Sequence, residues 1–146
     1  MRPRMLVKKL RADAQVPEYK SNGAAGMDLV AAIDAPIELA PGARAAVGTG
    51  LAVAIPDGWE GQVRARSGRA REEGLALVNA PGTIDSDYSG EVTVLVINLG
   101  QAPIVIRPKE RIAQLVIAPV ARVAVEVVEE LPGTARGAGG FGSTGR

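Results

Sequence analysis

The chain has 146 residues, a net charge of +1 and neither cysteine nor histidine. A single domain is expected at this length, and the charge balance lacks the electrostatic footprint of proteins that bind duplex nucleic acid or anionic membranes. Without Cys and His there are no disulfides, no zinc–thiolate site and no ordinary serine-hydrolase triad. An enzymatic base would therefore be a carboxylate, and a metal would be a hard ion bound by oxygens.

Short apolar stretches separated by Gly and Pro predict an all-β domain. Turn signals lie at Ala40–Gly42, Pro56–Gly58 and Ala80–Gly82. Short strands at this spacing are typical of a sandwich or jelly roll. The expected strands, in chain order, are Met5–Leu10, Ile37–Leu39, Arg44–Gly48, Leu51–Ile55, Glu60–Arg66, Leu75–Val78, Glu91–Leu99, Ile104–Ile106, Arg111–Val120 and Val123–Val128.

Two of the predicted elements carry further expectations. Both faces of Glu91–Leu99 are largely apolar, so we expect this strand to be covered on both sides. Ser67–Glu73 is the only segment with a helical pattern. Its Ser67 is a candidate N-cap, Arg69 and Glu73 form an i,i+4 pair, and Gly74 is placed to end the helix.

The two ends of the chain lead to separate expectations, one about location and one about flexibility. No apolar run approaches the roughly 20 residues that cross a bilayer, and the N-terminus does not resemble a secretory signal, so we expect a soluble, cytoplasmic protein. From Ala135 to Arg146 the only large apolar residue is Phe141, and five of twelve residues are Gly. Such a segment cannot offset its ordering entropy, so we divide the chain into a β domain (1–133) and a flexible tail (134–146).

The tail has two interpretations. One is a frayed terminus. The other is a nucleotide lid, in which Arg136 pairs with phosphate, glycine N–H groups approach an anion, Ser143 and Thr144 donate hydroxyls, and Phe141 stacks on a planar ring.

Four further segments also have a functional and a structural interpretation. Gly82–Gly90 is either a polar hairpin loop or a catalytic loop with Asp85 as the candidate base. Arg64–Gly68 is either a solvated basic edge or a phosphate site at a helix start. Asp28 is either a turn former or an indirect metal ligand. Gln114 is, by its pattern alone, the polar position of a strand.

Taken together and in this order, the five segments resemble the five motifs of the trimeric dUTPase family. The family often has Pro before its Arg-Ser-Gly and an apolar residue after it, where this chain has Ala65 and Arg69, which affects the packing under the helix. The segments are Ala25–Ala31, Arg66–Gly68, Asn79 with Gly82–Gly90, Arg111–Leu115 and Arg136–Gly145.

The resemblance implies a dUTPase-like, β-clip jelly roll that assembles as a homotrimer with active sites shared between subunits. It implies hydrolysis of dUTP to dUMP and pyrophosphate with Mg²⁺, which keeps uracil out of DNA and supplies dUMP for dTTP synthesis. Asp85 would activate water and Asp28 would bind the magnesium through water. The implied substrate contacts are Asn79, Gly82, Thr83, Ile84 and Tyr88 for the nucleoside, Arg66, Ser67, Gly68 and Gln114 for the phosphates, and Arg136, Phe141, Gly142, Ser143 and Thr144 for the closing tail.

Two rival functions remain open. A dCTP deaminase shares the implied fold, but such enzymes usually lack the Gly-Phe-Gly-Ser-Thr tail. A nucleotide sensor would bind dUTP without turnover, and the intact Asp85 argues against it.

Overall fold

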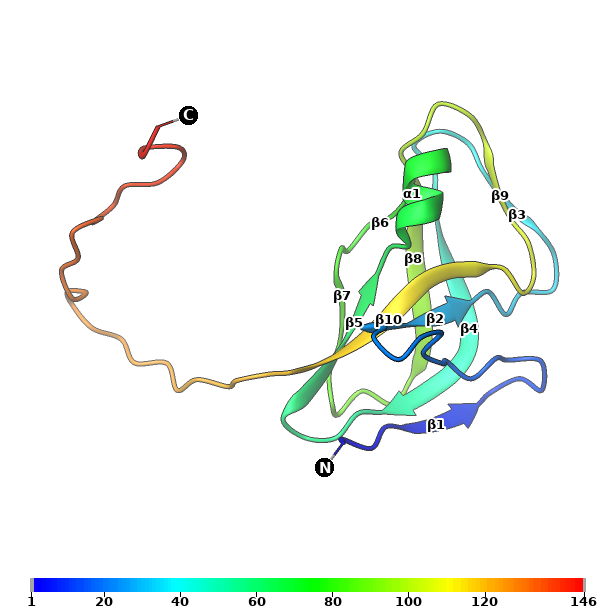
Figure 1. Cartoon of the computed structure of the whole chain (residues 1–146), viewed down its shortest axis with the longest axis horizontal. Coiled ribbons are helices and arrows are strands. Elements are labelled where there is room, and N and C mark those ends of the chain that lie inside the picture. Colours follow the sequence, from blue (N-terminus) through cyan, green and yellow to red (C-terminus); the bar gives the residue numbers. More distant parts are fainter. Residues whose placement is uncertain (1, 146) are drawn as a thin grey trace.

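The computed structural model describes residues 2–145 and forms a sandwich of two four-stranded sheets with a smaller two-stranded one (Figure 1). The strand orders are β1-β4-β8-β6, β2-β10-β5-β7 and β3-β9, and every adjacent pair is antiparallel. The elements are β1 (Leu6–Lys9), β2 (Gly26–Val30), β3 (Ile37–Leu39), β4 (Arg44–Ala54), β5 (Trp59–Arg64), α1 (Ser67–Glu73), β6 (Leu75–Leu77), β7 (Gly82–Ile84), β8 (Glu91–Asn98), β9 (Ile104–Ile106) and β10 (Arg111–Pro119).

The core lies between the sheets and consists of aliphatic side chains. Val94 of β8, Leu115 of β10 and Ile106 of β9 have no exposed surface, although they belong to three different sheets. Their burial follows the period-2 alternation of each strand, which sends every second side chain inward. The all-β prediction with one short helix is therefore confirmed for residues 2–145.

The structure differs from the predicted strands in four places. Arg44–Gly48 and Leu51–Ile55 are one strand, β4, interrupted by a register shift between Gly48 and Ala52. Two short strands, β2 and β7, went unpredicted because they begin with glycine and carry polar residues, so pairing with neighbours decides their conformation. Val123–Val128 forms no strand.

The outer face of β8 is also less covered than its sequence suggests. Val92, Val94 and Val96 are buried, whereas Thr93 and Leu95 on the other face are exposed. The expectation that both faces are covered is thus wrong for the single chain.

The short helix α1 has its predicted bounds and C-cap. Gly74 adopts the left-handed conformation, but the N-cap position belongs to Arg66 and no side chain caps the helix, so the prediction for Ser67 was wrong. Arg69 pairs with Glu73 as predicted and also with Glu110, 3.2 Å away, before β10. The hydrogen bond to Glu73 raises the pKa of Arg69. Because Glu73 belongs to α1 itself, it is the ion pair with Glu110 that attaches the helix to the body, at the position where the family often has an apolar residue.

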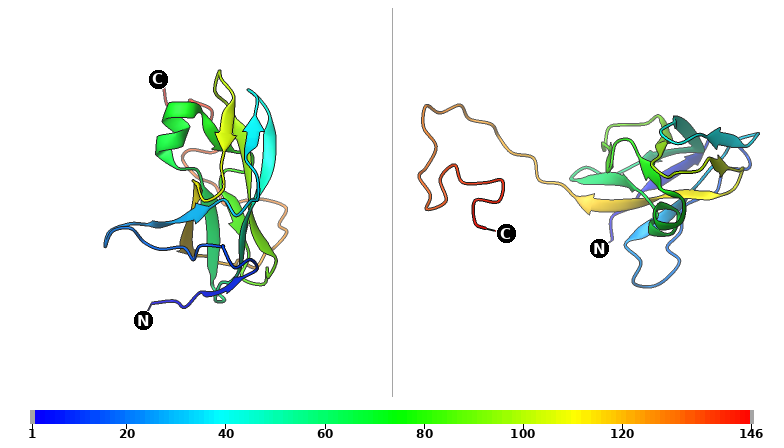
Figure 2. Two further views of the ribbon diagram at one scale, coloured as in Figure 1. Left: turned by 90° about the vertical axis from the view of Figure 1, so that its right-hand side faces the viewer. Right: turned by 90° about the horizontal axis from the view of Figure 1, so that it is seen from above.

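Beyond β10 the chain leaves the body. Figures 1 and 2 show the described residues after Pro119 running away from the sheets. Val123, Val125 and Val127 are each at least 80% exposed, so this segment contributes nothing to the core. Within residues 2–145, no helix is long and apolar enough to cross a membrane. The division of the chain into a β domain (1–133) and a flexible tail (134–146) stays a prediction.

Candidate active site

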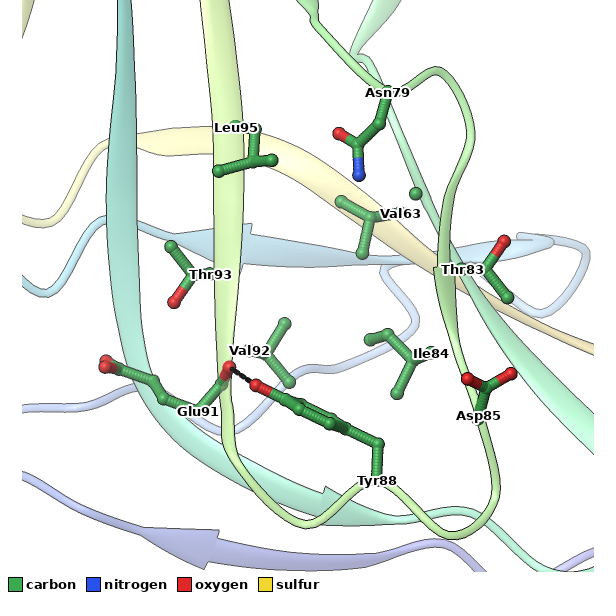
Figure 3. A pocket seen from close by; sticks show the side chains of 11 residues that line it. Val63, Asn79, Thr83, Ile84, Asp85, Tyr88, Glu91, Val92, Thr93 and Leu95 are labelled. Atoms are coloured by element: carbon green, nitrogen blue, oxygen red, sulfur yellow. Dashed lines mark hydrogen bonds between the residues drawn. The ribbon is translucent and has the colours of Figure 1, made fainter.

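A pocket of about 250 Å³ opens between β7, the loop that follows it, and β8 (Figure 3). Asn79 lies at one end of this pocket and Tyr88 at the other, with Ile84 and Val63 between them on its floor. Gly82, Thr83 and Asp85 also line it, so five predicted site residues and the predicted base meet here. Because ligand pockets usually measure about 300–1,000 Å³, this one suits only part of a nucleotide.

The loop carrying Asp85 is not a hairpin, which corrects one of the two interpretations of Gly82–Gly90. Its flanking strands belong to different sheets, since β7 pairs with β5 whereas β8 pairs with β4 and β6. The loop therefore crosses from one sheet to the other, with a turn closed by the Tyr88 N–H donating to the Asp85 carbonyl at 3.1 Å. This crossing leaves the Asp85 side chain exposed at the pocket rim.

A second cluster gathers residues from three segments around Asp28. Its carboxylate oxygens face two guanidinium groups: Oδ1 lies 3.0 Å from Arg66 Nε and Oδ2 lies 3.1 Å from Arg111 Nη1. Gln114 stands opposite Asp28 in the β2–β10 pairing and donates from Nε2 to the Ala65 carbonyl at 2.9 Å. Asp28 lies within β2 and not in a turn, which corrects that interpretation.

The position of Arg111 in this cluster depends on a bulge in β10. In a regular strand, residues three apart point to opposite faces. The register shifts between Arg111 and Ala113, so Arg111 pairs with Val30 while Gln114 pairs with Asp28. Val30 and Asp28 share a face of β2, and cross-strand partners share a face, so the bulge brings Arg111 to the side of Gln114. The sequence analysis included Arg111 in a motif segment but gave it no role in the site, and a regular period of 2 would place it on the face opposite Gln114.

The start of α1 adjoins this cluster. Ser67 and Gly68 follow Arg66 directly and are both exposed at the first turn of the helix. An exposed first turn leaves backbone N–H groups without helical partners, which suits an anion. The cluster as a whole can therefore accept negative charge, with two arginines against one carboxylate.

The predicted tail residues stand apart from both groups. Arg136 donates from Nε to the Gly139 carbonyl at 2.8 Å, and Phe141 is fully exposed. Ser143 and Thr144 are exposed as well. Within residues 2–145, no side-chain hydrogen bond or ion pair joins the tail to the pocket or to the Asp28 cluster.

The acidic residues do not build a metal cage by themselves. The described part of the chain contains no group of three or more Asp or Glu residues that could hold an ion. Both oxygens of Asp28 are engaged by arginines, so this carboxylate suits a water-mediated contact with a metal better than direct ligation. The donor set fits a hard ion whose remaining ligands come from water and phosphate.

Comparison with known families accounts for this arrangement. A dUTPase family model matches residues 12–145, which contain all five motif segments. The chain belongs to the dUTPase family. Among curated dUTPases, it is 58% identical over 132 residues to the deoxyuridine 5′-triphosphate nucleotidohydrolase of Anaeromyxobacter sp. strain Fw109-5, covering 90% of this chain and 88% of the relative. It is 55% identical to the enzyme of the same name from Syntrophotalea carbinolica, covering 95% of each chain.

Solved dUTPase structures share the fold. The dUTPase of Staphylococcus bacteriophage 80alpha, solved with dUPNHPP, superposes with a TM-score of 0.89 at 29% identity, covering 98% of this chain and 99% of the phage chain. This likeness supports the jelly-roll-like architecture predicted for the dUTPase sequence, because it spans both large sheets and the extended C-terminal segment.

Proposed function

We propose that this chain hydrolyses dUTP to dUMP and pyrophosphate. The observation that carries the proposal is the pocket in which Asp85, Asn79 and Tyr88 meet, within a chain whose family match runs almost from end to end. The two curated relatives are named for this activity, and the phage enzyme binds dUPNHPP, an analogue of dUTP. In the cell this reaction keeps uracil out of DNA and supplies dUMP for dTTP synthesis.

The pocket at β7 and β8 binds the nucleoside. The side-chain amide of Asn79 and the backbone of Gly82, Thr83 and Ile84 pair with the edge of uracil. Tyr88 packs against the deoxyribose and leaves no room for a 2′-hydroxyl, because its ring lines the end of the pocket opposite Asn79.

The Asp28 cluster binds the triphosphate. Arg66 contributes a guanidinium, Ser67 and Gly68 contribute donors at the helix start, and Gln114 contributes a side-chain amide. Asp28 contacts a magnesium ion through water, and bound Mg²⁺ supplies charge neutralisation of the phosphates. Asp28 also holds Arg66 and Arg111 in place in the absence of substrate, because it pairs with both.

Asp85 acts as the general base. Its carboxylate orients a water molecule and takes a proton as the water oxygen bonds to the α-phosphorus, while the bond from that phosphorus to the bridging oxygen breaks and pyrophosphate leaves. Such a reaction needs positioning and charge stabilisation more than covalent help. The chain has no histidine or cysteine that could take this role, and Asp85 lies at the rim of the pocket.

The complete site is built from several copies of the chain. The pocket suits only part of a nucleotide, and the tail residues lie beyond the body that carries the pocket. In a homotrimer the tail crosses to a neighbour, where Phe141 stacks on the base, Arg136 pairs with the phosphates, and Gly142, Ser143 and Thr144 close over them. A cytoplasmic location remains a prediction from the sequence.

A panel of nucleotides tests the activity directly. The purified protein is incubated with Mg²⁺ and each of dUTP, dCTP, dTTP and UTP, and both pyrophosphate and ammonia are measured. Pyrophosphate from dUTP is expected. Ammonia from dCTP would identify a deaminase, and dUTP binding without either product would identify a nucleotide sensor.

A further inference from the structure

Gly90, directly before β8, is held in contact with the ring of Tyr88. A Cβ atom added at Gly90 would lie 2.5 Å from the Tyr88 hydroxyl oxygen and 2.7 Å from Cζ, closer than real Cβ atoms approach such atoms. The φ of Gly90 is outside the left-handed region, so its backbone does not require glycine. A side chain at this position would therefore have to displace the Tyr88 ring, which supplies all three of the nearest atoms.

Glu91, the residue after Gly90, holds the same ring through a hydrogen bond. The Tyr88 hydroxyl donates to the Glu91 backbone carbonyl at 2.9 Å, as Figure 3 shows. The Glu91 carboxylate in turn accepts the Gly50 N–H at 2.8 Å, across the sheet. The ring is thus confined by contact with Gly90 and by a hydrogen bond to Glu91, even though Tyr88 is 46% exposed.

A bulge in β4 fixes the position of the Glu91 carbonyl. The β4–β8 register shifts between Gly48 and Ala52, and Gly50 within this bulge has a φ of +67° that favours glycine. The buried hydroxyl of Thr49 donates to the Val92 carbonyl at 2.6 Å. The bulge therefore holds the first two residues of β8 through two hydrogen bonds, and the Glu91 carbonyl that anchors Tyr88 is fixed with them.

We propose that Gly90 is a positioning residue for sugar selection, and that it acts through Tyr88 with Glu91 as the anchor. The proposal rests on the role given above to Tyr88 in excluding a 2′-hydroxyl. Exclusion by contact works only if the excluding group cannot move away, because a ring that swings outward makes room for the larger sugar. Gly90 lets the ring lie close to the backbone, and the hydrogen bond to Glu91 holds it there.

The contact distances set the size of the expected effect. With a methyl group at residue 90, the Tyr88 hydroxyl would have to retreat from 2.5 Å to ordinary van der Waals separation, a shift of roughly 1 Å. Displacements of this size in a binding site change rates by about a hundredfold when geometry is critical. Gly90→Ala should therefore lower the ratio of kcat/KM for dUTP to that for UTP by at least about tenfold.

The test compares Gly90→Ala, Tyr88→Ala and the double variant, with kcat/KM measured for dUTP and UTP. Gly23→Ala is the matched control, because a Cβ at Gly23 would meet nothing within 4 Å. If Gly90 acts through Tyr88, the double variant should have the selectivity of Tyr88→Ala alone, within about twofold, since coupled residues are not additive. A role in folding alone would move the melting temperature and leave this ratio unchanged.

The outcomes separate this proposal from the role of Tyr88 itself. If Tyr88→Ala lowers selectivity and folded Gly90→Ala does not, the positioning role of Gly90 is overturned while the role of Tyr88 stands. If neither does, both are overturned. If Gly90→Ala does not fold, Tyr88→Phe decides, because it removes only the hydrogen bond to Glu91. A several-fold fall in selectivity supports the anchor, and an unchanged ratio overturns it.

Discussion

Two inactive variants of this chain should restore activity when they are refolded together. The first variant is Asp85→Asn with an intact tail, and the second ends at Gly133 with Asp85 intact. Each lacks a different part of the proposed site. Among the described tail residues, Arg136, Phe141, Ser143 and Thr144 are exposed and have no side-chain hydrogen bond to the body of their own chain, so in a trimer they are available to a neighbour.

The expected recovery follows from the symmetry of a threefold ring. Random assembly of equal amounts makes about three-quarters of the trimers mixed, and each mixed trimer contains one site of three that has both parts intact. About a quarter of wild-type activity should therefore return, provided the sites act independently. If each tail serves Asp85 of its own chain, no site has both parts and recovery should be close to zero.

The assay measures pyrophosphate released from dUTP after the variants are unfolded together and refolded. Native mass spectrometry verifies that mixed trimers have formed, since the two chains differ in mass. The control mixes the variants after separate refolding, when exchange has not occurred. Verified mixed trimers with no more activity than the two variants assayed separately would refute the crossed tail.

Three further predictions concern single sites. Asp85→Asn should keep dUTP binding and lower kcat at least about a hundredfold, as expected for loss of a general base, and a near-normal kcat would remove Asp85 from the mechanism. The chain ending at Gly133 should keep its melting temperature, because no residue from 134 to 145 is buried; a large drop would make the tail structural. Arg111→Gln should raise KM for dUTP about tenfold, equivalent to about 1.4 kcal/mol, because the phosphate cluster loses a charge and Asp28 loses a partner. Arg71→Gln, on the exposed side of α1, is its control, and an equal effect in both variants would contradict a specific role for Arg111.

The sequence by itself determined the class of fold and the chemical groups of the site. The period-2 alternation of Val92, Val94 and Val96 predicted that these three side chains share one face of a strand, and the structure confirms that they are buried together in β8. The absence of His and Cys left a carboxylate as the base. The bounds of α1 also followed from local signals, because Gly74 ends a short helix at little steric cost.

Only the tertiary structure decided which of these groups meet. The bulge in β10 brings Arg111 to Asp28. No pattern in the neighbouring sequence predicts this bulge, because it arises in the pairing of β10 with β2. The strands β7 and β8 enter different sheets, so the segment that could have been a polar hairpin loop is a crossing loop with Asp85 at the rim of a pocket. The sequence also did not predict the contact between Gly90 and Tyr88. A glycine in sequence indicates either conformational freedom or close approach, and only the coordinates of the neighbouring ring distinguish the two.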